Sequence, residues 1–311
     1  MKHFTSVNDV PNLELLKQDA QDLASHPNMY QEMGKGRTLG MIFFNPSLRT
    51  RMSTQRAAHL LGLSTIVMNI GKEGWNLEFE DGVIMNGDKA EHIRDAASVM
   101  GQYCDIIGIR AFAGLDDQKQ DYSEPILNAF KQYAGVPILS LESATLHPCQ
   151  SFADVLTIEK HKHSKRPKVV LTWAPHPKAL PQAVANSFVQ WMQQEDVDFV
   201  LTHPKGYELG ETFLQGVHTE YEQRAAFENA DFIYAKNWSS FHSYGKVLPI
   251  EENWMVTSEK MNLTHNAHFM HCLPVRRNVV VSDAVIDSPN SLVKDQALHR
   301  VVAVQTVLVH M

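Results

Sequence analysis

The sequence has little of what secreted or membrane-spanning proteins need. Its three cysteines, Cys104, Cys149 and Cys272, lie far apart and form no CxxC pair, which argues against a disulfide framework and a zinc knuckle. No run of 18 apolar residues occurs, so no membrane-spanning helix is expected. The first residues also lack the apolar region of a secretory signal. These absences predict a soluble protein of the reducing cytoplasm.

Basic charge is also scarce. Twenty-eight Lys and Arg residues face 35 Asp and Glu residues, which gives a net charge of −7. A mildly acidic chain offers no electrostatic footprint for nucleic acid and no basic patch for anionic membranes. We therefore expect neither partner. Histidine, in contrast, is abundant with 16 residues, but no HExxH pattern occurs and we expect no metal and no other cofactor.

Short apolar runs alternate with helical patterns along the chain, which is typical of βαβ units around a parallel sheet. This rhythm predicts an α/β fold of two domains, each a mostly parallel sheet of about four strands flanked by helices. The predicted strands span 39–44, 64–69, 106–109, 137–140, 168–173, 198–201, 232–235 and 268–272. Helices predicted between them include 50–61, 88–104, 151–160, 181–193 and 221–229.

The domain limits follow from this pattern. We expect a first domain at 1–150 and a second at 151–290, with a last helix at 291–311 that packs back onto the first. The basic run 160–168 near the junction is either an anion site or a solvated linker face, and the linker is the simpler interpretation.

The first segment with chemical character is Ser47-Leu48-Arg49-Thr50, which follows an apolar strand and opens a helix. The first turn of a helix presents unpaired N–H groups and favours an anion. Two hydroxyls and a guanidinium add donors suited to phosphate oxygens. Spacing alone leaves an ordinary capped helix with a surface arginine as an equal alternative.

Two further segments lie at predicted strand ends, where parallel sheets bind ligands. His147-Pro148-Cys149-Gln150 follows one strand, although each His-Pro pair taken singly is more often a structural turn. His271-Cys272-Leu273-Pro274 follows another and leads to Arg276. Cys272 alone would be a small core residue, whereas Arg276 at a strand end is better explained by a bound carboxylate or phosphate.

Together the three segments resemble the aspartate/ornithine carbamoyltransferase family, in its order and at its separations. The Ser-Met-Gly loop of members that act on free ornithine is missing, and so is the lysine loop of aspartate members. Segments 74–78, 83–92 and 236–238 instead resemble the branch that carbamoylates N-acylated ornithine. The resemblance implies an enzyme of arginine biosynthesis, a cytoplasmic homotrimer with shared active sites.

The resemblance also implies roles for individual residues. Thr50, Arg110 and His147 would polarise the carbonyl of carbamoyl phosphate, and Cys272 is the fourth residue expected in the catalytic set. Gln150 and the backbone carbonyls of Cys272 and Leu273 would hold the carbamoyl amide. The full set implied for carbamoyl phosphate, in the first domain and its partners, is Ser47, Leu48, Arg49, Thr50, Trp75, Arg110, His147, Gln150, Cys272, Leu273 and Arg300.

For the acylornithine, which the second domain is expected to bind, the resemblance implies Glu142, His176, Lys236, Leu273 and Arg276, with Ala90 from the adjacent subunit. Acetyl-specific members carry Glu at position 90 and the succinyl type carries Pro. Alanine leaves room and adds no charge, whereas a glutamate would repel a succinyl carboxylate. N-succinyl-L-ornithine is therefore the favoured acceptor, converted to N-succinyl-L-citrulline, and N-acetyl-L-ornithine is the alternative.

Three other functions remain as competitors. The missing Ser-Met-Gly loop disfavours an ornithine carbamoyltransferase. A non-catalytic anion-binding module would keep the phosphate cradle but would not need His147, Gln150 and Cys272 together. A nucleotide-dependent dehydrogenase is disfavoured because no G-x-G-x-x-G follows any strand.

Overall fold

The chain forms two parallel five-stranded sheets, each at the centre of its own unit. In this computed structural model, which describes residues 1–311, unit 1 consists of Met1–Cys149 with Arg300–Met311, and unit 2 consists of Gln150–His299. The α/β fold with two domains is thereby confirmed. Each sheet has one strand more than the sequence predicted, because the short edge strands near His3 and His218 carry no clear apolar pattern.

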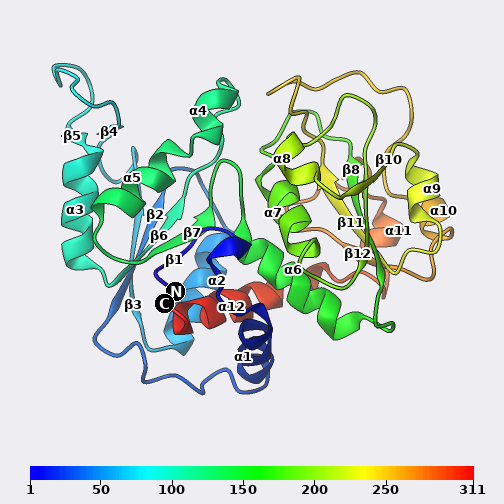
Figure 1. Ribbon diagram of the computed structural model, residues 1–311, viewed down its shortest axis with the longest axis horizontal. Helices are drawn as coiled ribbons and strands as arrows, with labels where there is room; N and C mark the ends of the chain where they lie inside the picture. Colours follow the sequence, from blue (N-terminus) through cyan, green and yellow to red (C-terminus); the bar gives the residue numbers. More distant parts are fainter. The chain divides into compact units, whose positions relative to one another are not determined.

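Unit 1 is built on the strand order β1-β7-β6-β2-β3, and every neighbouring pair is parallel (Figure 1). Its elements are β1 (His3–Phe4), the 3-10 helix η1 (Val7–Asp9), α1 (Leu13–Ser25), β2 (Thr38–Phe43), α2 (Arg49–Leu60), β3 (Ser64–Asn69), β4 (Leu77–Glu78), β5 (Glu91–His92), α3 (Ile93–Tyr103), β6 (Ile106–Arg110), α4 (Gln118–Tyr122), α5 (Pro125–Tyr133), β7 (Ile138–Glu142) and the part of α12 (Val293–Val309) from Arg300 onward.

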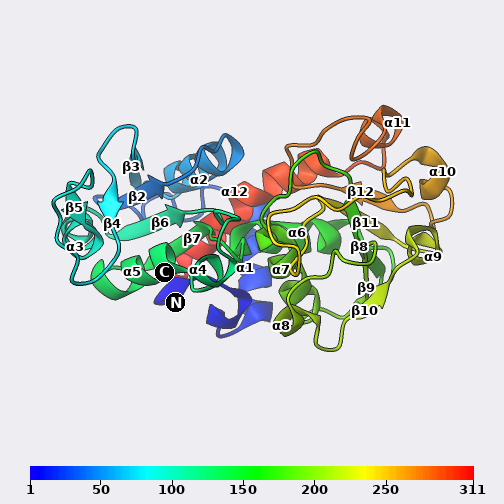
Figure 2. The same cartoon turned by 90° about the horizontal axis from the view of Figure 1, so that it is seen from above.

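One face of this sheet is covered by α3 and α5, because alternate strand residues are apolar on that side. Ile42, Ile107 and Ile109 from the strands pack there with Ile93 and Phe130 from the helices. The two chain ends lie side by side in unit 1, where the Met1 amino group donates to the His310 carbonyl (Figure 2).

Unit 2 has the strand order β10-β9-β8-β11-β12, again parallel throughout. Its elements are α6 (Pro148–His161), which enters from unit 1, β8 (Lys168–Ala174), α7 (Ala183–Met192), β9 (Asp198–Thr202), α8 (Glu211–Leu214), β10 (His218–Glu220), α9 (Gln223–Phe227), β11 (Phe232–Asn237), α10 (Ser258–Met261), β12 (His268–Met270), α11 (Asp283–Ile286) and the start of α12.

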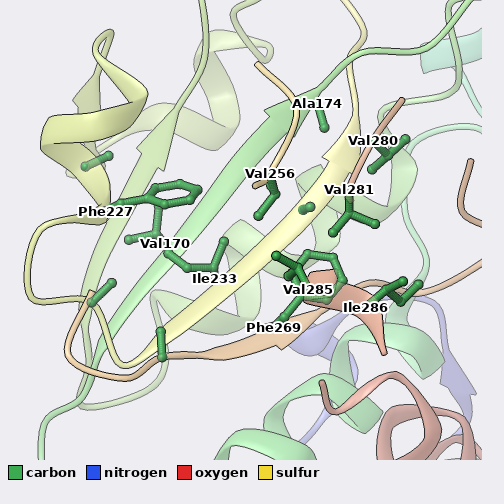
Figure 3. Close-up of a cluster of buried hydrophobic side chains, with 14 of the residues drawn as sticks. Val170, Ala174, Phe227, Ile233, Val256, Phe269, Val280, Val281, Val285 and Ile286 are labelled. Carbon is green, nitrogen blue, oxygen red and sulfur yellow. The ribbon is translucent and has the colours of Figure 1, made fainter. Parts of the chain in front are cut away.

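The core on one face of this sheet consists of branched and aromatic side chains that point toward one another (Figure 3). Val170 from β8, Ile233 from β11 and Phe269 from β12 meet Val281 and Val285 from the chain that follows. Each side chain of this size stabilises the fold by about 1.5–3 kcal/mol when it is fully buried.

Several predicted boundaries were wrong for local reasons. The helix predicted at 88–104 begins only at Ile93, because His92 caps it by accepting from the Arg94 N–H and pairs in β5 with Glu78 of β4. The strand predicted at 268–272 ends at Met270, since Leu273 has a left-handed φ of 55°. No helix is both long and apolar enough to cross a membrane.

Candidate functional site

The predicted phosphate cradle of unit 1 lies where β2 ends and α2 begins. Leu48 occupies the N-cap position of α2, and no side chain caps the helix. The first N–H groups of α2 therefore keep their capacity to bind an anion. Ser47 and Arg49 are half-buried, Leu48 is exposed and Thr50 is buried. The alternative, an ordinary helix start capped by a side chain, does not form here, because no side chain caps α2.

Thr50 is the point at which two arginines meet. Its Oγ1 accepts from Arg110 Nη1 at 2.8 Å and from Arg300 Nη2 at 2.6 Å. Both guanidinium groups are buried, although Arg300 is 250 residues away from Thr50 in the sequence. Two buried guanidinium groups at the first turn of a helix offer N–H donors and positive charge that suit a phosphate group.

Glu142 and His147 join this group from the next strand. Arg110 and Glu142 end the adjacent strands β6 and β7, where the register shifts, and Arg110 Nη1 lies 2.6 Å from Glu142 Oε2. The same carboxylate oxygen lies 3.4 Å from His147 Nε2, just before α6. The structure thus brings together Thr50, Arg110, Glu142, His147 and Arg300, although the sequence analysis assigned Glu142 to the acylornithine.

Cys149, two residues after His147, has a structural environment. Its Sγ lies 3.4 Å from the Ser140 carbonyl, and burial raises the pKa of the thiol to about 12. A thiol of this kind stays protonated at neutral pH and is a poor nucleophile. It therefore offers no route to a covalent intermediate.

Glu124, which no sequence motif indicated, holds the turn between Glu142 and His147. Its carboxylate accepts from Ser143 Oγ at 2.6 Å, from the Thr145 N–H at 2.8 Å and from the Ala144 N–H at 3.2 Å. Glu124 itself has a left-handed φ of 50° before Pro125 opens α5. A Glu-Pro helix start has no pattern that points to a turn about twenty residues further along the chain.

Trp75 and Ala90 lie on an exposed part of unit 1. The Trp75 side chain is 58% exposed, and its Nε1 donates to Glu91 Oε2 at 2.8 Å, next to the exposed Ala90. Ile84 between them is 80% exposed. Trp75 therefore lies on an exposed segment and is not a core tryptophan.

Unit 2 gathers cations around a histidine at the carboxyl ends of its strands. Arg276 Nε donates to His176 Nε2 at 3.1 Å. Burial lowers the pKa of His176, and the charges of Arg276, Lys236 and Lys178 lower it further. Lys236 is buried near the end of β11. Because the neutral imidazole accepts from Arg276 through Nε2, the groups suited to donate to carboxylate oxygens are the cations around it, Arg276 and Lys236.

Three further predicted residues lie in unit 2. Gln150 is 1% exposed in the first turn of α6, and Cys272 is buried in the turn that follows β12. Leu273 precedes a cis peptide bond to Pro274, and its N–H donates to His271 Nδ1 at 2.9 Å.

No group of three or more His, Cys, Asp or Glu side chains is arranged to hold a metal ion. Four of the 16 histidines, His161, His163, His265 and His268, line a cavity of about 400 Å³ in unit 2, which the sequence did not predict.

Parallel sheets with arginines and histidines gathered at their carboxyl ends define an α/β protein with sites suited to anions. Its family is shown by similarity to known proteins. Residues 2–160 match the model of the aspartate/ornithine carbamoyltransferase carbamoyl-P binding domain, and residues 181–311 match that of the Asp/Orn binding domain. The chain belongs to the aspartate/ornithine carbamoyltransferase family and is a carbamoyltransferase.

Similar proteins span the whole chain. The N-succinylornithine carbamoyltransferase of Bacteroides thetaiotaomicron is 53% identical over 99% of this chain and 98% of its own length. The N-acetylornithine carbamoyltransferase of Xanthomonas campestris is 36% identical over 96% of this chain and 94% of its own length. A crystal structure of acetylornithine transcarbamylase complexed with acetylcitrulline matches with a TM-score of 0.94 at 35% identity, covering 100% of this chain and 99% of that one.

Proposed function

We propose that this enzyme transfers the carbamoyl group of carbamoyl phosphate to the δ-amine of N-succinyl-L-ornithine. The products are N-succinyl-L-citrulline and phosphate, and the reaction serves arginine biosynthesis. The observation that carries the choice of acceptor is the pair of cations, Arg276 and Lys236, beside the neutral His176. N-succinylornithine has two carboxylates and an uncharged α-nitrogen, so its acceptor site needs two cations.

Carbamoyl phosphate is held at its phosphate end by the start of α2, with Ser47, Leu48, Arg49 and Arg110 as ligands and Trp75 completing the site. Thr50 and Arg110, which already contact each other, polarise the carbonyl oxygen together with His147. Arg300 supports the same oxygen through Thr50. Gln150 and the backbone carbonyls of Cys272 and Leu273 hold the amide.

The chemistry needs no covalent intermediate. The neutral δ-amine attacks the carbonyl carbon, and a tetrahedral oxyanion forms and collapses with loss of phosphate. Arginine donors fixed before the reaction stabilise this developing charge, which is worth about 3–4 kcal/mol for a single donor in comparable sites. The rest of the rate enhancement comes from holding both substrates in line for the reaction.

Acceptor recognition follows from charge. Lys236 binds the α-carboxylate and Arg276 the succinyl carboxylate, with His176, Glu142 and Leu273 beside them. Ala90 leaves space for the longer acyl group. A solved N-acetyl-L-ornithine transcarbamylase in which one glutamate is replaced by alanine, complexed with carbamyl phosphate and N-succinyl-L-norvaline, supports this argument. The 53% identical relative supports the same substrate.

N-acetyl-L-ornithine is the second candidate acceptor. The 36% identical relatives and the acetylcitrulline complex favour it. An acetyl group carries no charge, however, and would leave Arg276 without a carboxylate to bind. For this reason the succinyl compound is the better match.

We also propose a homotrimer in the cytoplasm, with Trp75 and Ala90 completing the site of a neighbouring subunit. Exposed apolar side chains between these residues, Val83, Ile84 and Met85, support a protein partner for this segment. Sedimentation analysis of the purified protein tests the oligomeric state, and a monomer would contradict the proposal.

The choice of acceptor can be tested directly. Citrulline formation from carbamoyl phosphate is measured with N-succinylornithine, N-acetylornithine and ornithine at equal concentrations. We expect kcat/KM for the succinyl compound to exceed that for the acetyl compound by about 10-fold or more, as one charged hydrogen bond provides. Turnover of free ornithine alone would contradict the proposed function.

A further inference from the structure

The interior of unit 2 contains a carboxylate, Asp154, that has no part in the chemistry above. It lies in α6 and is 0% exposed. A buried carboxylate needs hydrogen-bond donors to offset its lost hydration. Two amide groups supply them, because Gln150 Nε2 donates to Asp154 Oδ1 at 2.8 Å and Gln296 Nε2 donates to the same oxygen at 2.9 Å.

These bonds fix which atom each amide presents elsewhere. A carboxylate only accepts, so both glutamines must turn their NH₂ groups toward Asp154 and their oxygens away from it. For Gln296 the consequence is visible, since its Oε1 accepts from the His271 N–H at 2.8 Å. This N–H belongs to the His271–Leu273 turn. Asp154 thereby acts on both segments that are proposed to hold the carbamoyl amide.

A third group links Asp154 to the same turn. Tyr234 of β11 is buried, and its pKa is raised by burial first and then by the neighbouring Asp154 and Cys272. The phenol therefore stays protonated. The carboxylate of Asp154 and the thiol of Cys272, whose backbone carbonyl is proposed to bind substrate, thus both influence the same phenol.

We propose that Asp154 is a positioning residue that makes the amide end of the site an all-acceptor surface, selective for the NH₂ group of carbamoyl phosphate. Gln150 offers its oxygen, and the turn at Cys272 and Leu273 offers two carbonyls. An acyl phosphate of the same shape with a methyl group in place of NH₂, such as acetyl phosphate, has no donors for these oxygens. The inference rests on the proposed function, because that proposal assigns the amide to Gln150, Cys272 and Leu273.

The test uses Asp154→Asn, which preserves shape but can present a donor and lets Gln150 turn over. We expect kcat/KM for carbamoyl phosphate to fall about 10- to 100-fold, as for the loss of a charge-assisted hydrogen bond. By titration calorimetry, we expect the ratio of the Kd of acetyl phosphate to that of carbamoyl phosphate to fall at least about tenfold. The Kd of inorganic phosphate, which has no amide, should not change.

A donor–acceptor swap separates orientation from simple structural support. Gln150→Glu alone sets two carboxylates against each other and should also reduce activity. In the double variant Gln150→Glu with Asp154→Asn, the asparagine donates to the glutamate, whose second oxygen can still accept from substrate. We expect kcat/KM to recover at least about tenfold above either single variant, a non-additive result typical of residues in direct contact.

The outcomes distinguish the role inferred for Asp154 from the proposed transfer to N-succinylornithine. Equal loss of affinity for all three phosphates in Asp154→Asn, or losses that simply multiply in the double variant, would overturn the inference. Circular dichroism of each variant checks that it is folded, and the double variant tests orientation even where Asp154→Asn is poorly folded. Calorimetry needs no acceptor, so failure of succinylornithine turnover would count against the proposed function alone.

Discussion

At the scale of single residues, neighbouring arginines in unit 2 have different environments. Arg276 is exposed and contacts a neutral histidine. Arg277 is neutralised by Asp287 at 2.7 Å and Asp283 at 2.8 Å. Of the two, Arg276 is the arginine that we propose binds a substrate carboxylate, and its charge would then decide which acyl group is accepted.

Replacing Arg276 should alter substrate preference more than folding. For Arg276→Gln we expect kcat/KM for N-succinylornithine to fall about 10- to 100-fold, because a charged hydrogen bond is lost, while that for N-acetylornithine changes little. Arg277→Gln is the matched control and should leave both values near wild type. Equal losses with both acceptors in Arg276→Gln would show that this arginine does not bind the succinyl carboxylate.

At the scale of elements, the carboxyl ends of β6 and β7 present Arg110 and Glu142 side by side. The turn that follows β7 must then deliver His147 to the same place, and Glu124 from the start of α5 supports it. Glu124, at the N-cap of α5, thereby supports the turn that leads to His147. The geometry of the turn depends on hydrogen bonds that converge on one carboxylate.

Removing this support should loosen unit 1. Glu124→Ala leaves the Ser143, Ala144 and Thr145 donors without their acceptor, so we expect the unfolding free energy to fall by about 1–3 kcal/mol. Urea denaturation measures the loss, with the exposed Glu251→Ala as a control that should change little. An unchanged midpoint for Glu124→Ala would mean that the turn holds its shape without the carboxylate.

At the scale of the whole molecule, the large histidine content has a consequence for acid stability. Five histidines, His3, His176, His203, His268 and His299, have lowered pKa values, and burial is the largest cause in each. Their folded forms bind a proton less readily than the unfolded chain does. Stability is therefore complete above the unfolded value near 6.5 and is lost as the pH falls.

His299 provides the sharpest test. Its pKa is lowered to about 4, and its Nδ1 lies 2.8 Å from Thr157 Oγ1. As the pH falls from 6.5 to 4, the cost of protonating His299 in the folded state should lower the unfolding free energy by up to about 3 kcal/mol. We expect urea midpoints of His299→Gln to depend less on pH over this window than wild type, while exposed His59→Gln behaves as wild type. An identical pH dependence in His299→Gln and wild type would contradict the assignment.

The α/β class, the two parallel sheets and the segments with chemical character could all be predicted from the sequence. Strand and helix periodicity is local, and the Ser47–Thr50 and His147–Gln150 segments depend on their immediate neighbours in the chain. Arg300 was expected at the phosphate only by resemblance, since nothing in the sequence near it indicates a ligand. Its position depends on the tertiary structure, because the last part of α12 belongs to unit 1 and places Arg300 against Thr50.

Only the tertiary structure revealed Glu124 and Asp154 as supports of the site. Each is an ordinary helix-forming acid in the sequence, and each acts on groups from other elements or turns. Their roles depend on burial and on donors that converge from distant parts of the chain. The sequence contains 16 histidines, but only the folded structure determined which five of them have lowered pKa values.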